Sequence, residues 1–260
     1  MASEPADVLV VGAGASGAVV ALRLAEAGFR VICLEQGEWH DKREYPGVRP
    51  DWELAARKQW ATSPNIRGLP EDYPVVEDDS PMSPLMFNGV GGSTILFAGA
   101  WPRMLPSDFR VRSLDGIADD WPLTYDDLLP YYRRTDRDFG VSALGGDPAY
   151  PPDDVDPPLR PLPIGAAGLK VARAHTRLGW HWWPEFNAIL SAPYDGRQPC
   201  VLRSTCQSGC NEGAKASTNI THWPKAIAKG AQLVTGARVR RIERNAAGLA
   251  TGATWIDRSG

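Results

Sequence analysis

The start of the chain alternates between short apolar runs and a glycine-rich turn. Residues 7–11 (DVLVV) form a β-branched apolar run, which predicts a strand buried on both faces. Residues 18–27 have the spacing of a helix that stops at Gly28, and residues 30–34 (RVICL) predict a second strand. The order strand, glycine turn, helix and strand predicts a βαβ unit.

The middle of the chain has weaker periodicity. Residues 39–84 interleave aromatics and prolines and predict irregular loops. Residues 125–137, with Thr124 as N-cap, and residues 166–178 predict helices. Residues 146–163 are dense in proline and should run extended, as a linker or as a segment wrapped on the surface.

The last third of the chain returns to regular elements. Residues 217–229 predict one helix, with Pro224 near its first turns. Short β runs follow at residues 232–235, 238–243 and 250–256, with a turn before the last of them. The final residues are a turn sequence with no closing element, which we interpret as truncation of a longer polypeptide.

Composition and charge narrow the functional classes. The chain has 260 residues, 43% of them hydrophobic and 23% charged, as in a soluble globular protein with a core. Its net charge of −3 offers no basic field for nucleic acid or anionic lipid. Residues 8–22 are apolar, but glycines interrupt them and they are shorter than the roughly 20 residues that span a bilayer. We therefore predict no signal peptide or transmembrane segment, which by sequence favours a cytoplasmic location. A periplasmic face reached through a partner subunit stays open, so the compartment is left unassigned.

Residues 12–17 (GAGASG) carry the first chemical signal, the spacing G-x-G-x-x-G directly after a strand. Gly12 permits a tight turn, Gly14 allows close approach of a pyrophosphate, and Gly17 allows close packing of helix and strand. Glu35 ends the next predicted strand, where a carboxylate accepts hydrogen bonds from ribose hydroxyls and disfavours NADP. The motif predicts dinucleotide binding but leaves FAD and NAD open, and a purely structural glycine turn is the alternative.

Further segments carry a family resemblance. Residues 87–94 (FNGVGGST) resemble the second signature of the glucose–methanol–choline (GMC) flavoprotein oxidoreductases. Residues 120–125 (DWPLTY), continuing to residues 131–132, are similar to the segment that follows it in the gluconate and glucose dehydrogenase branch. Residues 206–217 (CQSGCNEGAKAS) and 236–242 (GARVRRI) are similar to the same branch. The chain thus resembles the N-terminal portion of a bacterial sugar dehydrogenase flavoprotein large subunit.

This resemblance implies FAD, held without NAD. The family often has Asn or His where this chain has Phe97, so we expect the FAD to be non-covalent. For the second glycine loop, a bend between core strands is the structural alternative. The residues that the resemblance and the glycine pattern assign to FAD are Gly12, Gly14, Ala15, Ser16, Gly17, Glu35, Gly91, Gly92, Ser93, Phe97, Ala98, Gly99, Ala100 and Val239.

The cysteines divide into two kinds. Cys33 lies inside a predicted strand and is interpreted as a small core hydrophobe. Cys200, Cys206 and Cys210 have the spacing C-x5-C-x3-C in a polar loop, where three thiolates can converge on one inorganic centre. A [3Fe–4S] cluster suits that count, and the resemblance is to iron–sulfur large subunits. A disulfide plus one thiol, or zinc with His222 as fourth ligand, are the alternatives.

Three other groups of residues are interpreted as structural. The histidines are predicted to be solvated or locally bonded; they are His40, His175, His181 and His222. An aromatic cluster could line a sugar site but is more often core or interface; it comprises Trp180, Trp182, Trp183 and Phe186. The acids of the proline-rich segment are predicted to be solvated; they are Asp153, Asp154 and Asp156.

Together these observations predict an α/β fold, a Rossmann-like three-layer FAD-binding domain built from discontinuous segments with a partial cap. We divide the chain into an FAD-binding segment (1–104), an inserted cap or substrate region (105–199), and a cysteine loop with a return to the FAD-binding domain (200–260). The resemblance implies oxidation of a CH–OH group of a sugar, sugar acid or other alcohol, with hydride transfer to flavin N5.

The resemblance also implies an electron route and partners. Electrons would leave through the iron–sulfur cluster to a haem or quinone acceptor, with a small subunit and a cytochrome c subunit as partners. The catalytic acid–base residues are expected beyond the C-terminus of this chain, so we expect no turnover by the chain alone. An oxygen-using alcohol oxidase with a structural cysteine loop, and a non-catalytic FAD-binding fragment, are the alternatives.

Overall fold

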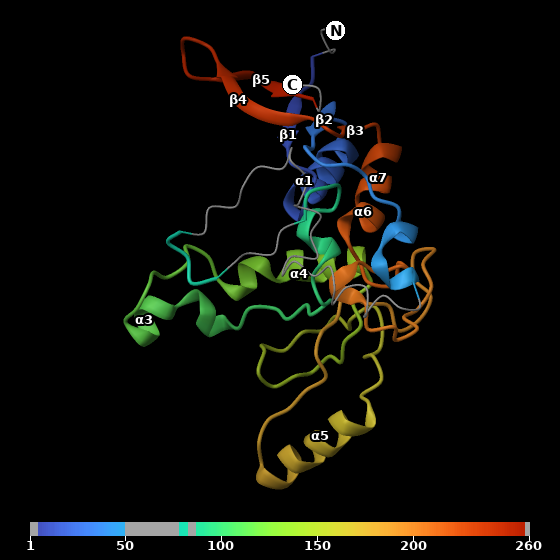
Figure 1. The fold of residues 1–260 in the computed structure, drawn as a ribbon. Coiled ribbons are helices and arrows are strands. Elements are labelled where there is room, and N and C mark those ends of the chain that lie inside the picture. Colours follow the sequence, from blue (N-terminus) through green and yellow to red (C-terminus); the bar gives the residue numbers. More distant parts are fainter. Residues whose placement is uncertain (1–4, 50–77, 83–86, 258–260) are drawn as a thin grey trace. The chain divides into compact units, whose positions relative to one another are not determined.

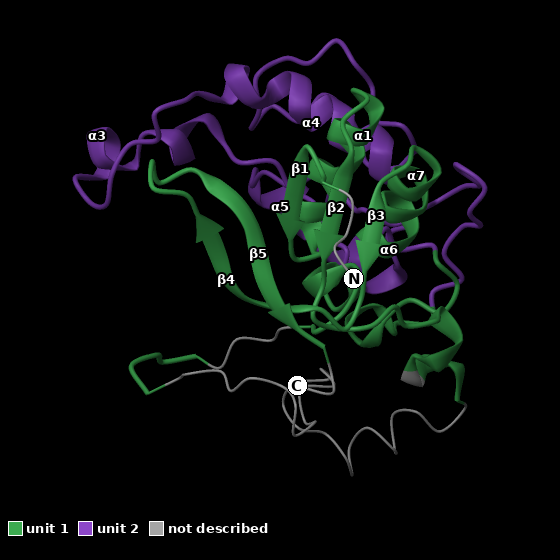
Figure 2. Cartoon of the chain, turned by 90° about the horizontal axis from the view of Figure 1, so that it is seen from above, with its two compact units in different colours: residues 1–98, 203–213, 217–260 green, residues 99–202, 214–216 purple. Residues whose placement is uncertain are grey.

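The computed structural model describes residues 5–49, 78–82 and 87–257. The chain divides into two compact units (Figure 2). Unit 1 comprises residues 1–98, 203–213 and 217–260, and unit 2 comprises residues 99–202 and 214–216. Unit 1 is therefore assembled from segments far apart in the sequence. Most of the predicted irregular segment, residues 39–84, lies outside the described residues.

The sheet of unit 1 contains the predicted βαβ unit. Strand β1 (Val8–Val11) pairs in parallel with β2 (Val31–Leu34), and helix α1 (Ala15–Glu26) connects them. Strand β3 (Gln232–Val234) pairs in parallel with β2, which gives the order β1-β2-β3 (Figure 1). A strand from near the end of the chain thus lies beside the first supersecondary unit.

Helices cover one face of this sheet. The core there joins the strands to α1 and to helix α7 (Trp223–Ala228). Its largest residue is Trp223, which is fully buried. Other buried members of the cluster are Val10, Ala18, Ala21, Leu22, Ala25, Val31, Cys33, Val90 and Ala226.

The predicted single helix over residues 217–229 is two helices. Helix α6 (Thr218–Thr221) ends before His222, and α7 begins after it at Trp223, so His222 caps both helices. Pro224, in the first turn of α7, has no N–H to donate to the preceding turn, and its ring clashes with the carbonyl four residues earlier. The proline therefore interrupts the helix instead of lying within it.

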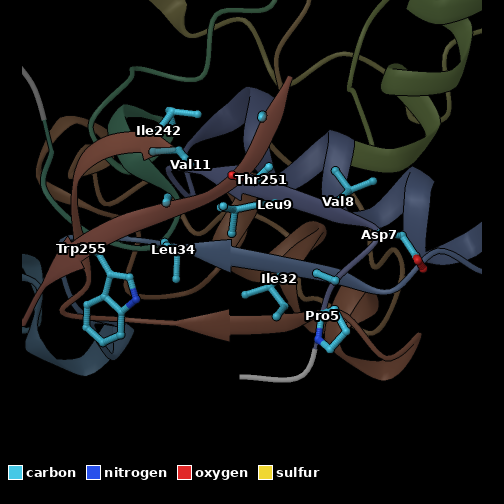
Figure 3. Close-up of a pocket in the computed structure, with 14 residues that line it drawn as sticks. Pro5, Asp7, Val8, Leu9, Val11, Ile32, Leu34, Ile242, Thr251 and Trp255 are labelled. Carbon is cyan, nitrogen blue, oxygen red and sulfur yellow. The ribbon is translucent and has the colours of Figure 1, made fainter. Parts of the chain in front are cut away.

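The opposite face of the sheet is only partly covered. Strands β4 (Arg238–Arg244) and β5 (Ala250–Ile256) form an antiparallel hairpin. A groove of about 640 Å³ is lined by side chains of this hairpin, including Trp255, and by residues of β1 and β2 (Figure 3). Val11 on β1 is 53% exposed. The prediction that the first strand is buried on both faces is therefore wrong, because among the described residues α1 and α7 pack against one face and the groove lies along the other.

Unit 2 contains α3 (Val111–Asp115), α4 (Tyr125–Phe139) and α5 (Ala166–Leu178). The predicted cap of α4 is present: the Thr124 hydroxyl accepts from the N–H of Asp127, and the Asp127 carboxylate accepts from the N–H of Thr124. The bounds of α5 coincide with the predicted range.

The proline-rich segment folds back onto α4 through an ion-pair network. Arg103 donates to Asp136 at 2.7 Å and to Asp153 at 2.8 Å, and Arg133 also donates to Asp153, at 2.6 Å. The Asp153 side chain is only 16% exposed. The prediction that this acid is simply solvated is therefore wrong, because two guanidinium groups hold it against the helix, whereas the side chain of Asp154 is 87% exposed.

The tryptophans after α5 do not form a core. Trp180 is 61% exposed and Trp182 is 37% exposed. The indole N–H of Trp183 donates to the carbonyl of Leu144 at 2.8 Å. Within the described part of the chain, no helix is both long and apolar enough to cross a bilayer.

Candidate functional site

The first glycine turn has the backbone geometry that its motif predicts. Gly12 has φ +92°, in the region that favours glycine. A Cβ at Gly17 would collide with the carbonyl oxygen of Gly12, so only glycine allows α1 to start this close to β1. At Gly14, by contrast, the nearest atom to an added Cβ would be 3.9 Å away. That atom is the Cα of Gly92, at ordinary van der Waals distance, so packing within the protein does not itself require glycine at position 14.

The carboxylate of Glu35 is held beside this turn. Its Oε2 accepts from the N–H of Ala13 at 2.7 Å, and its Oε1 accepts from the N–H of Gly37 at 2.8 Å. The residue is 6% exposed. Each carboxylate oxygen has a second lone pair, so both can still accept from ribose hydroxyls. The structure thus places the predicted acid next to the predicted phosphate turn.

The second glycine loop is bonded to the first. The N–H of Gly91 donates to the carbonyl oxygen of Ala13 at 2.9 Å, and the indole N–H of Trp223 donates to the same oxygen at 2.9 Å. Gly91 has φ +101°, and a Cβ at Gly92 would lie 2.8 Å from the Cα of Gly14. The two loops therefore meet backbone to backbone, and no larger residue fits at Gly92.

The start of α1 offers donors to an anion. Its N-cap residue, Gly14, has no side chain to cap the helix, and Ala15 and Ser16 in the first turn are exposed. The first N–H groups of a helix have no partner within the helix, and its macrodipole favours negative charge there. A helix start at Gly14 without a side-chain cap, exposed residues in its first turn and the adjacent acid of Glu35 fit the pyrophosphate and ribose of FAD.

The other predicted FAD residues are more scattered. The hydroxyl oxygen of Ser93 accepts from the N–H of Phe87 at 3.3 Å, and the rest of Ser93 is exposed. Phe97 and Ala98 belong to unit 1, whereas Gly99 and Ala100 belong to unit 2.

Two of these scattered residues have structural neighbours of their own. A Cβ at Gly99 would lie 2.5 Å from the side chain of Ile189, so this glycine is required for packing within unit 2. Val239 lies on β4 opposite Trp255. The roles of both residues toward FAD stay predictions.

Three residues of the site were missed by sequence reasoning. Trp223 anchors the first loop, and the Thr218 hydroxyl donates to the carbonyl of Gly91 at 3.3 Å. An added Cβ at Gly91 would lie 3.1 Å from Asn219. All three follow the cysteine loop in sequence, and no local pattern there indicates contact with glycine loops that lie 127 to 210 positions earlier.

The cysteines give two different outcomes. Cys33 is fully buried, as predicted, and burial raises the pKa of its thiol to about 12. Cys206 and Cys210 belong to unit 1 and Cys200 to unit 2. None of the cysteines forms a disulfide, and among the described residues no group of three or more His, Cys, Asp or Glu could hold a metal ion. The [3Fe–4S] cluster and its alternatives therefore stay predictions.

The histidines have local neighbours, as predicted. His222 is fully buried, and its Nδ1 lies 2.8 Å from the hydroxyl of Thr221. His181 lies 3.0 Å from the carboxylate of Asp147. Neither residue has the setting of a metal ligand.

Comparison with known proteins supports FAD binding. The family model for the FAD binding domain matches residues 7–40. The chain is 45% identical to the 2-methyl-1,2-propanediol dehydrogenase of Mycolicibacterium austroafricanum, over 98% of this chain and 46% of that protein. It is 28% identical to the fructose dehydrogenase large subunit of Gluconobacter japonicus, over 97% of this chain and 49% of that protein.

The fold is shared with solved structures. The pyridoxine 4-oxidase from Mesorbium loti superposes with a TM-score of 0.56 at 19% identity, over 98% of this chain and 47% of that one. This likeness confirms the predicted α/β FAD-binding fold. The chain spans about half the length of the curated relatives it matches.

Proposed function

We propose that this chain is the FAD-binding portion of a GMC oxidoreductase that oxidises a CH–OH group of an alcohol or sugar. The observation that carries the proposal is the junction of the two glycine loops at the carbonyl of Ala13, directly beside Glu35. The relatives named as a propanediol dehydrogenase and a fructose dehydrogenase support an alcohol or sugar as the substrate class.

Each part of the site has a role in holding the cofactor. The N–H groups of Ala15 and Ser16 bind the pyrophosphate, with the positive end of α1 behind them. Glu35 accepts from the ribose hydroxyls. The second glycine loop, fixed by close packing of Gly91 against Asn219 and of Gly92 against Gly14, would border the flavin ring.

FAD, when bound, supplies the acceptor for the hydride that leaves the substrate carbon. Because the described histidines have local neighbours, we assign none of them as the base that takes the hydroxyl proton. The catalytic acid–base residues therefore stay unassigned on this chain.

The iron–sulfur hypothesis rests on the spacing of Cys200, Cys206 and Cys210 and on the resemblance to iron–sulfur large subunits. The described residues hold no group that could ligate a metal ion, so we route no electron-transfer step through these thiols. A haem or quinone acceptor, a small subunit, a cytochrome c subunit and a cytoplasmic location are likewise proposals. Iron and acid-labile sulfide in anaerobically purified protein, lowered by each Cys→Ser change, would support the cluster; their absence would exclude it.

Flavin content tests the proposed function. Gly14→Val places a side chain beside the start of α1, where its Cβ makes only van der Waals contact and the backbone conformation is one that valine tolerates (φ −73°, ψ −161°). We expect the variant to fold but to lose bound FAD, measured by absorbance after gel filtration. Gly252→Val is the matched control, since nothing lies within 4 Å of an added Cβ there. Normal flavin content in Gly14→Val would contradict the assignment.

A further inference from the structure

Helix α5 presents a contiguous apolar stripe to solvent. Within it, only Ala172 is buried. Val171 is 56% exposed and Leu178 is 60% exposed. With Ala167 and Ala174 these two residues have the spacing i, i+4, i+7 and i+11, which places them on one face of the helix.

A basic stripe runs beside the apolar one. Lys170, Arg173 and Arg177 have the spacing i, i+3 and i+7 and are all exposed. No Asp or Glu occurs in α5, although the whole chain has a net charge of −3. The chain is therefore negative in total, but the surface of α5 carries only positive charge.

An exposed indole extends the apolar stripe. The ring of Trp180 packs edge-on against the ring of His175, with 5.5 Å between centroids. His175 lies four residues after Val171 and three before Leu178, so it adjoins the apolar stripe on the helix surface. Trp180 is 61% exposed. Trp, Leu and Val on one face with Lys and Arg next to it is typical of helices that lie in a bilayer interface.

We propose that α5 and Trp180 form a peripheral binding surface for an anionic phospholipid bilayer. An apolar stripe alone would suit a protein partner equally well. The uninterrupted positive charge beside it favours phosphate headgroups, because each Lys or Arg near an anionic leaflet adds to the attraction. With 13 residues, α5 lies on such a surface and does not span it.

Vesicle flotation tests the surface. The purified chain is mixed with vesicles of equimolar phosphatidylglycerol and phosphatidylcholine, or of phosphatidylcholine alone. We expect partitioning about tenfold stronger onto the anionic vesicles, falling at high salt as exposed charges are screened. Equal partitioning onto both vesicles, or none onto either, would overturn the proposal.

Paired variants distinguish vesicle binding through the apolar stripe of α5 from binding through any exposed apolar residue. Val171→Asp with Leu178→Asp should lower partitioning about tenfold. Leu114→Asp with Ile117→Asp is the matched control, because these residues are 63% and 64% exposed elsewhere in unit 2. Circular dichroism checks that both pairs fold. Equal partitioning of the two pairs would contradict a role for α5.

Charge reversal and association state complete the test. Lys170→Glu with Arg173→Glu and Arg177→Glu should abolish the preference for anionic vesicles while leaving secondary structure intact. Light scattering monitors self-association in the same samples. Self-association that Val171→Asp abolishes, without vesicle binding by the wild type, would show a protein interface and exclude the lipid surface.

Discussion

The indole N–H of Trp223 donates to the carbonyl oxygen of Ala13 at 2.9 Å, across 210 positions of sequence. The same oxygen accepts from the N–H of Gly91. One carbonyl group therefore connects both glycine loops and α7, and the geometry of the first turn depends on a residue near the far end of the chain.

Trp223→Phe removes that donor from a fully buried position. We expect the free energy of unfolding to fall by about 1–3 kcal/mol, since a buried hydrogen bond and part of the packing are lost. Urea denaturation followed by circular dichroism measures the change. Trp121→Phe is the control, because Trp121 is 52% exposed and its replacement should change stability by less than about 0.5 kcal/mol. Equal stability of the two variants would show that the hydrogen bond from Trp223 to Ala13 contributes nothing to the free energy of unfolding.

Gly17→Ala tests the close approach of α1 to the turn. Its methyl group would collide with the carbonyl of Gly12, so the helix must shift, at a cost of about 1–3 kcal/mol. Gly165→Ala, before α5, meets nothing within 4 Å and serves as control. Thermal unfolding should show a lower midpoint for Gly17→Ala alone. An unfolding midpoint of Gly17→Ala equal to that of the wild type would mean that the turn accommodates the methyl group without strain.

Asp153 should give unit 2 a dependence on pH. Burial raises the pKa of this carboxyl, but hydrogen bonds from Arg103 and Arg133 outweigh it, so the pKa lies below the ordinary 3.8. The folded state then binds the proton less tightly than the unfolded state. The stabilisation is present above pH 3.8 and is lost as pH falls through the lowered pKa.

Asp153→Asn isolates this contribution. At neutral pH we expect a loss of about 1–3 kcal/mol in the free energy of unfolding, and the difference from wild type should shrink in acid. Asp154→Asn, at a side chain that is 87% exposed, should have little effect. A difference between Asp153→Asn and wild type that stays constant with pH would contradict the ion-pair explanation.

The cysteines should differ in reactivity. The pKa of about 12 leaves almost no thiolate at Cys33 at neutral pH, and the residue is fully buried. Brief alkylation of the native protein, read by mass spectrometry, should therefore spare Cys33 and modify Cys200, which is partly exposed. Denaturation should make both react. Modification of Cys33 in the native protein would indicate opening of the core between β2 and α1.

Local features of the fold could be predicted from the sequence. The cap at Thr124, the bounds of α5 and the βαβ unit all depend on residues a few positions apart, and each was confirmed. The phosphate turn and Glu35 could be placed for the same reason, since one strand and one helix separate them.

Features that depend on distant residues could not be predicted. The burial of Asp153 is set by Arg103, which lies 50 positions earlier. The hydrogen bond from Trp223 joins α7 to the first glycine turn, and no sequence pattern common to these two segments indicates it. The exposure of Val11 depends on what packs against the second face of the sheet, and a β-branched run looks the same whether one face or both are covered.

The two hydrogen bonds to Glu35 have a kinetic consequence. Because Ala13 and Gly37 hold the carboxylate in place before a nucleotide arrives, association need not wait for the Glu35 side chain to find its rotamer. The observed rate of FAD association would then rise in proportion to cofactor concentration, without the plateau that a slow rearrangement of this side chain would impose. Differences in FAD retention among variants would arise from the dissociation rate.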